Sequence, residues 1–338
     1  MKKVIVSLLF CIILLDSSWA QGEKSQSEKL AVDTSFLLPI KGVKQYLEIK
    51  GASIGKPVLL FIHGGPSWPA TPMNRKYNQD LSKDFIFVSW DQRNCGKSQS
   101  DTTVTLTPEL YVEDAHLVTQ FLKKTFHKNK IFVIGHSWGS LIGVELVQKY
   151  PTDYAAYVGA GQMVNPGKSE MLARTYAMQQ ASRKNDTATL NALATIQFSE
   201  KEGFENLEDL FKFRDLANKY TTGKDEVNLE NSMQLYSDYC TSGCITLALR
   251  GIKQLFSYVN GGKTNLFRYN EFKLPVYFFV GKYDYVCSAE LEQRYFKTIK
   301  APKKKLLVFE RSGHNLNWQE PDLFHDRLLE IAKATKTN

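Results

Sequence analysis

The sequence contains few of the residues on which metal sites and disulfide frameworks depend. Its 338 residues include five cysteines and six histidines, and no pair of histidines lies near the cysteines at the spacing of a zinc site. Internal repeats, low-complexity runs and heptad patterns are also missing, which excludes solenoids and coiled coils. With 43% hydrophobic and 23% charged residues, the composition is that of one large globular core, with or without an inserted subdomain.

The first twenty residues have the features of a secretory signal peptide. Lys2 and Lys3 precede an apolar run from Val4 to Leu15, and residues 18–20 place small side chains at the two positions that signal peptidase recognises. That run is too short for a stable membrane anchor, and no later stretch is long and apolar enough to span a bilayer. We expect cleavage near Ala20 and an exported protein, periplasmic or secreted; an uncleaved anchor is the alternative.

The net charge is positive, +8 for the full sequence, yet the basic residues are scattered. The densest cluster, KAPKKK at 300–305, has no interleaved aromatic residues and precedes a predicted strand. It therefore indicates a solvated turn, and we expect no nucleic-acid partner.

Cys240 and Cys244 are close enough in sequence to pair across a turn, but spacing alone does not decide whether they do. Nothing in the sequence indicates an oligomeric state.

Short apolar runs rich in β-branched and aromatic residues alternate with segments of helical periodicity. Strands are predicted at 56–65, 84–92, 130–137 and 153–161, and helices at 107–126 and 138–150. Thr107 fits the N-cap of the first helix, with Pro108 in its first turn, and Pro151 ends the second. Continuous apolar strands that alternate with helices are typical of a parallel sheet covered on both faces.

This alternation stops between about 165 and 270, where the pattern is helical, polar and irregular. It resumes with strands at 274–284 and 304–314 and helices at 288–299 and 323–335. We therefore predict an α/β fold with a mostly parallel, doubly wound sheet and an inserted helical cap. The core comprises residues 21–164 and 271–338, and the cap residues 165–270. A separate helical domain is less favoured, because the sheet is incomplete without the C-terminal strands.

The stretch VIGHSWGS at 133–140 places a serine between two glycines, where a predicted strand ends and a predicted helix begins. A G-x-S-x-G pattern alone is a weak signal, but in this position it is typical of a nucleophile elbow. Bulky side chains two positions before or after the serine would collide with strand and helix, so Gly135 and Gly139 permit the sharp turn. The pattern predicts Ser137 as a nucleophile next to a helix N-terminus.

A serine hydroxyl needs a general base, and the base needs an acid that holds its tautomer. Three histidines lie in or at the end of predicted helices, namely His116, His127 and His325. His63 lies in a glycine-rich turn that it is expected to brace, and His136, next to the serine, is expected to point away. His314 remains, on a loop directly after a predicted strand, and is the predicted general base.

The acid is expected between nucleophile and base in chain order on this type of fold. Asp284 meets that condition and directly follows the predicted strand that resumes the sheet. Glu290 and Glu310 are weaker substitutes, one on a predicted helix and one within a predicted strand. The stretch FIHGGP at 61–66 supplies a glycine-rich turn after a strand, so the backbone N–H groups of Gly65 and Trp138 are the predicted oxyanion hole.

These motifs resemble those of the α/β-hydrolases of the proline iminopeptidase (prolyl aminopeptidase) type, peptidase family S33. The resemblance rests on HGGP (63–66), DQRNCGKS (91–98), GHSWGS (135–140), GKYDYVCS (281–288) and SGHN (312–315). It spans most of the core but not the cap. The resemblance implies an α/β-hydrolase fold, a Ser–Asp–His triad, no cofactor, no metal, and release of an N-terminal residue, preferably proline, from short peptides.

Three departures from the family pattern affect the predicted site. Asn94 stands where the family usually has glycine, and Asn is the side chain that best tolerates positive φ. The elbow reads GHSWG, a form common in esterases, where the family has GGSWG. In the loop after HGGP, Ser67 and Trp68 alter the rim of the predicted site. Cys95 and Cys287 fall within family motifs, which favours free thiols near the site.

The function predicted from these features is that of an exported serine hydrolase that acts on a small peptide or ester. An aminopeptidase must also bind the ammonium of its substrate, and the cap carboxylates that qualify are Glu170, Glu200, Glu202 and Glu205. The sequence does not choose among them. A carboxylesterase or lactonase with the same triad is the alternative, and a binding protein on the same fold is a third hypothesis.

Overall fold

The computed structural model describes residues 30–240 and 243–335, so the predicted signal peptide lies outside the described residues. Its main sheet has eight strands in the order β1-β2-β4-β3-β5-β6-β9-β10. Every neighbouring pair from β4 to β10 is parallel, whereas β1–β2 and β2–β4 are antiparallel. The strands are β1 (Val32–Ile40), β2 (Val43–Gly51), β3 (Val58–Ile62), β4 (Ile86–Trp90), β5 (Ile131–Ser137), β6 (Tyr154–Gln162), β9 (Val276–Gly281) and β10 (Lys304–Phe309).

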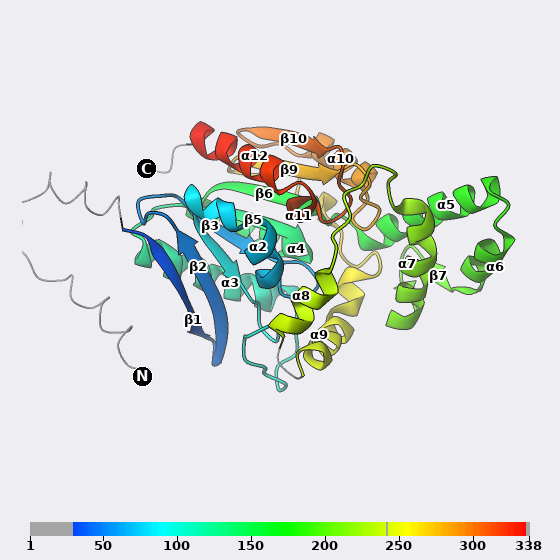
Figure 1. The fold of residues 1–338 in the computed structure, drawn as a ribbon, viewed down its shortest axis with the longest axis horizontal. Coiled ribbons are helices and arrows are strands. Elements are labelled where there is room, and N and C mark those ends of the chain that lie inside the picture. The colour runs from blue at the N-terminus through cyan, green and yellow to red at the C-terminus, as the bar shows by residue number, and fades with distance from the viewer. Residues whose placement is uncertain (1–29, 241–242, 336–338) are drawn as a thin grey trace, which may run out of the picture.

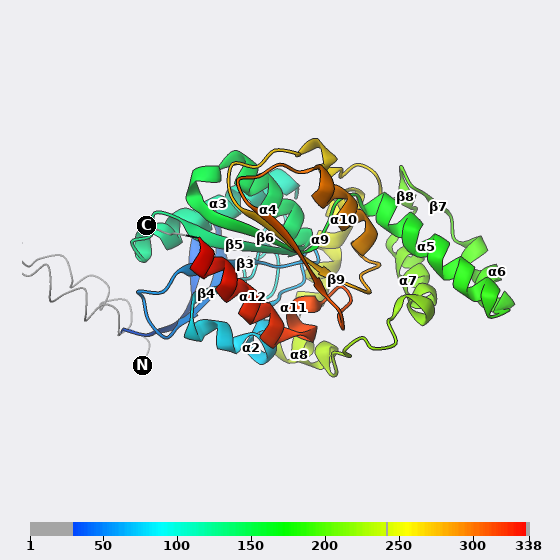
Figure 2. The ribbon, with the colours of Figure 1, turned by 90° about the horizontal axis from the view of Figure 1, so that it is seen from above.

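Helices cover both faces of this sheet, which confirms the predicted doubly wound α/β fold (Figures 1 and 2). One face carries α3 (Pro108–Thr125), α4 (Trp138–Lys149) and α10 (Ala289–Thr298), and the other α2 (Thr71–Tyr77), α11 (Leu316–Gln319) and α12 (Pro321–Ala334). As predicted, Thr107 caps α3 by accepting from the Leu110 N–H. Short 3₁₀ turns, η2 (Gln79–Lys83) and η3 (Pro151–Asp153), complete this part.

The antiparallel hairpin of β1 and β2 was not predicted, because polar residues interrupt the continuous apolar run by which the other strands were identified. β1 alternates half-buried and exposed positions along its length. In β2, Gln45 and Glu48 are buried through tertiary hydrogen bonds, the first with Asp114 and Trp90 and the second with Arg75. A strand whose buried polar groups find distant partners lacks the apolar run that marked the other strands.

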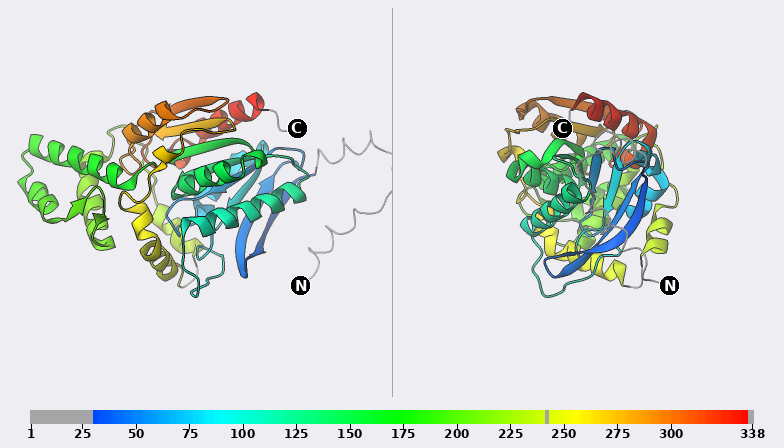
Figure 3. Two further views of the ribbon diagram at one scale, coloured as in Figure 1. Left: turned by 180° about the vertical axis from the view of Figure 1, so that it is seen from behind. Right: turned by 90° about the vertical axis from the view of Figure 1, so that its left-hand side faces the viewer.

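Between β6 and β9 the chain forms the helical insertion. Its elements are α5 (Pro166–Arg183), α6 (Thr187–Thr195), the two-residue strands β7 (Phe198–Ser199) and β8 (Gly203–Phe204), α7 (Leu207–Thr221), α8 (Ser232–Tyr239), α9 (Cys244–Val259) and η4 (Leu266–Arg268). Helices α5 to α7 extend away from the sheet (Figures 1 and 3), whereas α8 lies beside α2 of the core (Figure 2). Within residues 30–240 and 243–335, no helix combines the length and apolarity that a membrane span needs.

Candidate active site

Ser137 lies at the sharp turn between β5 and α4, as the nucleophile elbow requires. Its backbone adopts φ 54° and ψ −121°, a conformation that non-glycine residues rarely take and that is concentrated at functional sites. A Cβ atom on Gly139 would lie 2.1 Å from the Ile62 carbonyl oxygen, and one on Gly135 2.4 Å from the Gly139 carbonyl oxygen. Both glycines are therefore needed for the close approach of strand and helix.

Asp284 and His314 come together at the carboxyl end of the sheet, on the loops after β9 and β10. The His314 Nδ1 atom lies 2.8 Å from Asp284 Oδ2, and Asp284 Oδ1 accepts hydrogen bonds from the N–H groups of Val286 and Cys287 at 2.8 and 2.9 Å. Burial alone would raise the pKa of Asp284, but His314 and these two amides bring it below its ordinary value. Asp284 is thus a buried carboxylate that can orient the imidazole.

Ser137 and His314 line the same cavity, which has a volume of about 330 Å³ and also exposes Gly64 and Gly65. At the end of β6, a Cβ atom on Gly161 would lie 3.2 Å from both His314 Nδ1 and Asp284 Oδ2. This strand end therefore packs directly against the acid–base pair. The two weaker acid candidates lie elsewhere: Glu290 pairs with Arg294 and Glu310 with Lys282. Of the three carboxyls considered, Asp284 alone contacts the predicted base.

The glycine-rich turn after β3 lies directly against the nucleophile. A Cβ atom on Gly64 would stand 2.9 Å from the Ser137 Cβ. His63 braces this turn, as predicted: its Nε2 accepts from the Gln92 N–H at 3.1 Å and its Nδ1 lies 2.7 Å from the Gly64 carbonyl oxygen. Burial lowers the pKa of His63 to about 4, so the ring is neutral and can both accept and donate.

Trp138 is the first residue of α4, where backbone N–H groups have no partner within the helix. Its indole Nε1 donates to Gln92 Oε1 at 3.2 Å, and the ring is fully buried. Gln92 therefore connects the turn that carries Gly65 with the start of the helix. The arrangement places the two predicted oxyanion donors on neighbouring, braced segments.

His136 does not point away from the site, contrary to our expectation. It lines the same cavity as Ser137, and its Nε2 lies 3.1 Å from the His314 carbonyl oxygen. Burial, followed by the neighbouring His314, lowers the pKa of His136 to about 3, so the neutral ring donates to that carbonyl. The departure from GGSWG to GHSWG was the available signal. Only the packing of the end of β5 against the loop after β10 shows that this side chain contacts the His314 backbone.

The structure distinguishes one of the four cap carboxylates. Glu170 of α5 is 2% exposed and lines the cavity, whereas Glu200, Glu202 and Glu205 are exposed. It forms an ion pair with Arg214 of α7, which also lines the cavity. Glu170 Oε2 has no hydrogen-bond partner within the described residues. Burial raises the pKa of Glu170, and Arg214 opposes that shift. Sequence reasoning missed Arg214, because its partner is 44 residues away.

Cys287 lies beside the acid–base pair and, like Cys95, is an unpaired buried thiol, as expected. Ligand atoms of Asp284, Cys287 and His314 all lie within 4.8 Å of one another. Burial, reinforced by the nearby Asp284 carboxylate, raises the pKa of the Cys287 thiol well above its ordinary range. A protonated thiol is a poor metal ligand, so this cluster fits a hydrolytic acid–base pair with a neutral neighbour better than a metal centre.

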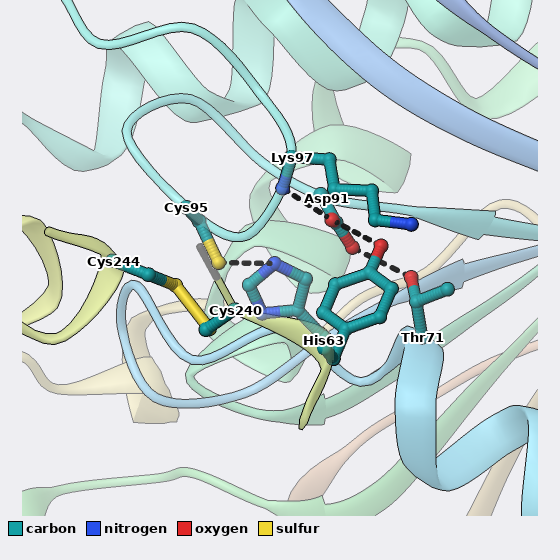
Figure 4. The surroundings of a disulfide bond; sticks show 8 residues. His63, Thr71, Asp91, Cys95, Lys97, Cys240 and Cys244 are labelled. Atoms are coloured by element: carbon teal, nitrogen blue, oxygen red, sulfur yellow. Dashed lines mark hydrogen bonds between the residues drawn. A yellow bond between two sulfur atoms is a disulfide. The ribbon is translucent and has the colours of Figure 1, made fainter. Parts of the chain in front are cut away.

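Helix α8 is anchored to the core by a buried carboxylate of the DQRNCGKS motif. Asp91 accepts hydrogen bonds from the Tyr239 hydroxyl at 2.7 Å, the Thr71 hydroxyl at 2.6 Å and the Lys97 N–H at 2.9 Å (Figure 4). Burial raises the pKa of Asp91 to about 6.

Next to Tyr239, Cys240 and Cys244 form a disulfide that joins α8 to α9, a pairing that the sequence had left open. Asn94, in the same loop, adopts positive φ as expected and hydrogen-bonds Asp101.

Comparisons with known proteins point to aminopeptidases. A family model described as serine aminopeptidase, S33, matches residues 58–322. The probable aminopeptidase YbaC of Bacillus subtilis (strain 168) is 30% identical over 324 residues, which cover 90% of this chain and 98% of that protein.

Solved structures of similar fold come from peptidases and esterases. A proline iminopeptidase of Mycobacterium smegmatis superposes with a TM-score of 0.64 at 16% identity, covering 89% of this chain and 98% of the other. The esterase RhEst1 from Rhodococcus sp. ECU1013 superposes with a TM-score of 0.59 at 14% identity, covering 90% and 99%. These similarities confirm the α/β-hydrolase fold; at such identities they show the fold alone.

Proposed function

We propose that this chain, which belongs to the serine aminopeptidase family S33, is an exported exopeptidase that releases N-terminal proline or similar residues from short peptides. Ser137 attacks the acyl carbon while His314 accepts its proton, and the backbone N–H groups of Gly65 and Trp138 stabilise the oxyanion. His314 then donates that proton to the leaving amine. Water hydrolyses the acyl-enzyme with His314 again as base, and Asp284 holds the imidazole tautomer throughout.

The observation that favours a peptidase over an esterase is the position of Glu170. Glu170 lines the cavity that contains Ser137 and His314, its Oε2 has no hydrogen-bond partner within the described residues, and it is the buried carboxylate of the four considered. A substrate ammonium placed there would satisfy an oxygen that otherwise lacks a hydrogen bond, in a site of low dielectric where ion pairs are strong. An ester without an amino group would leave that oxygen unsatisfied.

A carboxylesterase or lactonase is the second candidate, because the cavity wall is mainly apolar. Trp68, Met163, Leu210, Phe211 and Ile252 contribute to it. Such a surface would also accept the acyl chain of a simple ester. The triad chemistry is identical in the two cases, so the ammonium decides between them.

The test compares a proline anilide with a short-chain aryl ester that has no amino group. Glu170→Gln should lower kcat/KM for the anilide at least about tenfold and leave ester turnover within about twofold, because only the anilide presents an ammonium. Glu200→Gln, an exposed cap carboxylate paired with Lys168, is the matched control. Equal losses on both substrates, or ester turnover without anilide cleavage, would contradict the peptidase proposal.

Two further measurements address the nucleophile and the export. A fluorophosphonate should label the wild type and not Ser137→Ala, while the two proteins have the same circular dichroism; labelling of the variant would refute Ser137 as nucleophile. For export, N-terminal sequencing of the mature protein should begin at Gln21. Retention of residues 1–20 would contradict cleavage near Ala20.

A further inference from the structure

A second cavity adjoins the one that contains Ser137. Its volume is about 470 Å³, and four residues line both cavities: Trp68, Tyr236, Asn315 and Trp318. Trp68 comes from the turn after β3 and Tyr236 from α8, and their rings meet edge to face with centroids 5.1 Å apart. Asn315 follows His314 directly in the chain. The two cavities therefore share a wall beside the predicted general base.

The walls of the second cavity are held against the loop that carries His314. Linker 222–231, which joins α7 to α8, donates a backbone hydrogen bond from Val227 to the Arg311 carbonyl at 2.9 Å. Gln319 of α11 donates to Glu226 Oε1 at 2.9 Å and to the Val227 carbonyl at 2.7 Å, and accepts from the Gly313 N–H at 3.0 Å. Hydrogen bonds between the insertion and the core therefore hold the walls of this cavity in place.

The lining of the second cavity is polar and carries no positive charge among the described residues. Its polar members include Thr222, Asn228, Ser232 and Asn315. Asn228 is exposed and Asn315 is half-buried, and the side-chain amide of neither makes a hydrogen bond in the described parts of the chain. Of the described residues, Glu226 is the one acidic group that lines it, and both its oxygens already accept hydrogen bonds, from Gln319 and from the Gly223 N–H. Free amides beside a single carboxylate suit a neutral polar ligand.

We propose that the second cavity binds the leaving portion of the substrate, as the uncharged backbone of a peptide that continues for at least two residues beyond the released one. This inference rests on the proposed aminopeptidase function. With the substrate ammonium at Glu170, the N-terminal residue occupies the first cavity. The leaving nitrogen receives its proton from His314, so the remainder of the peptide extends past Asn315 into the second cavity. Peptide N–H and C=O groups would pair with the free amides there.

Substrate length follows from the charge of this lining. In a dipeptide, the free carboxylate belongs to the first leaving residue and would enter a cavity that, among the described residues, is lined by Glu226 and by no cation. In an amidated dipeptide or a tetrapeptide, a neutral amide occupies that place. Because like charges in a confined site repel, the structure favours longer or amidated substrates over free dipeptides.

The experiment measures kcat/KM for three peptides with the same first two residues: Pro-Ala, Pro-Ala-amide and Pro-Ala-Ala-Ala. The amide and the tetrapeptide should exceed the free dipeptide by about tenfold. Proline anilide, which lacks a peptide leaving group, monitors the catalytic machinery separately. If the anilide and all peptides remain uncleaved, the proposed function itself fails. If the anilide is cleaved and the three peptides agree within about twofold, only the second-cavity proposal is overturned.

Two matched variants locate the effect. Asn228→Lys adds a cation to the second cavity and should reduce the preference for the amide over the free dipeptide to about twofold or less. Asn218→Lys makes the same chemical change on the exposed surface of α7, outside both cavities. It should leave the tenfold preference intact. An equal shift in both variants, or none in Asn228→Lys, would overturn the assignment.

Discussion

The sheet and the helical insertion differ in how completely they are buried. Every residue of β3, β4, β5, β6 and β9 is buried, whereas α7 buries only Phe213, Ala217 and Thr221 of its 15 residues and exposes half of the Phe211 side chain. Close packing on both faces leaves the strand ends little freedom. Ser137 ends β5 and Asp284 follows β9, two of these buried strands. His314 follows the less buried edge strand β10, and its ring is held by Asp284.

The insertion contributes charge and shape rather than rigidity. Glu170 on α5 pairs with Arg214 on α7, and the hydrophobic cluster beneath them is small and rich in alanine. Helix α8 reaches the core through the Tyr239–Asp91 hydrogen bond and reaches α9 through the disulfide. We infer that the core performs the bond cleavage and the insertion selects the substrate. Changes in the two regions should therefore affect different measurements.

The largest expected effect is that of Asp284→Asn in the core. Asparagine preserves the shape of the side chain but would favour the wrong imidazole tautomer, so kcat should fall about 10⁴-fold on anilide and ester alike. Glu290→Gln, the neighbouring exposed carboxylate on α10, is the control and should change kcat less than twofold. Single-turnover kinetics with both substrates would measure this. Comparable loss in the two variants would remove Asp284 from the orienting role.

An intermediate effect is expected from His63→Gln, which tests whether burial in the core governs the pH dependence of stability. The pKa of His63 is about 4, below its value of 6.5 in an unfolded chain. Between these values the unfolded state binds more protons, so the contribution of His63 to the free energy of unfolding is present above pH 6.5 and is lost as the pH falls through 4. Glutamine does not titrate.

The stability advantage of the wild type over His63→Gln should therefore shrink by about 3 kcal/mol between pH 7 and pH 4. Urea unfolding at several pH values measures this difference, which should be constant above pH 7. Parallel loss of stability in both proteins would show that folding does not lower the pKa of His63.

The smallest effect is expected in the insertion, from Cys240→Ser. The disulfide closes a short loop, for which loss of the cross-link costs about 2 kcal/mol in the unfolded-chain model. We expect faster proteolysis between α8 and α9 and a higher KM, with kcat and the unfolding of the core unchanged. Reduction of the wild type should reproduce these changes and have no effect on the variant. A matching fall in core stability would contradict the separation of the two regions.

Sequence reasoning succeeded where a local pattern has one structural solution. Strands with continuous apolar residues, the Thr107 cap and the elbow glycines were all found as predicted. It did not find the β1–β2 hairpin, because Gln45 and Glu48 become buried only through partners far along the chain. It misjudged His136 for the same reason, since the His314 carbonyl is 178 residues away.

By itself, the sequence determined the doubly wound sheet, the serine elbow and the pair of loops from which an acid and a base would come. These depend on side-chain periodicity, turn chemistry and chain order, which are local properties. Only the tertiary structure decided that Asp284 and His314 lie 2.8 Å apart, that Glu170 rather than Glu200 faces the cavity, and that Cys240 pairs with Cys244. Which polar groups share a cavity depends on how buried surfaces from distant segments pack together. The sequence of one segment does not show which distant segments it will contact.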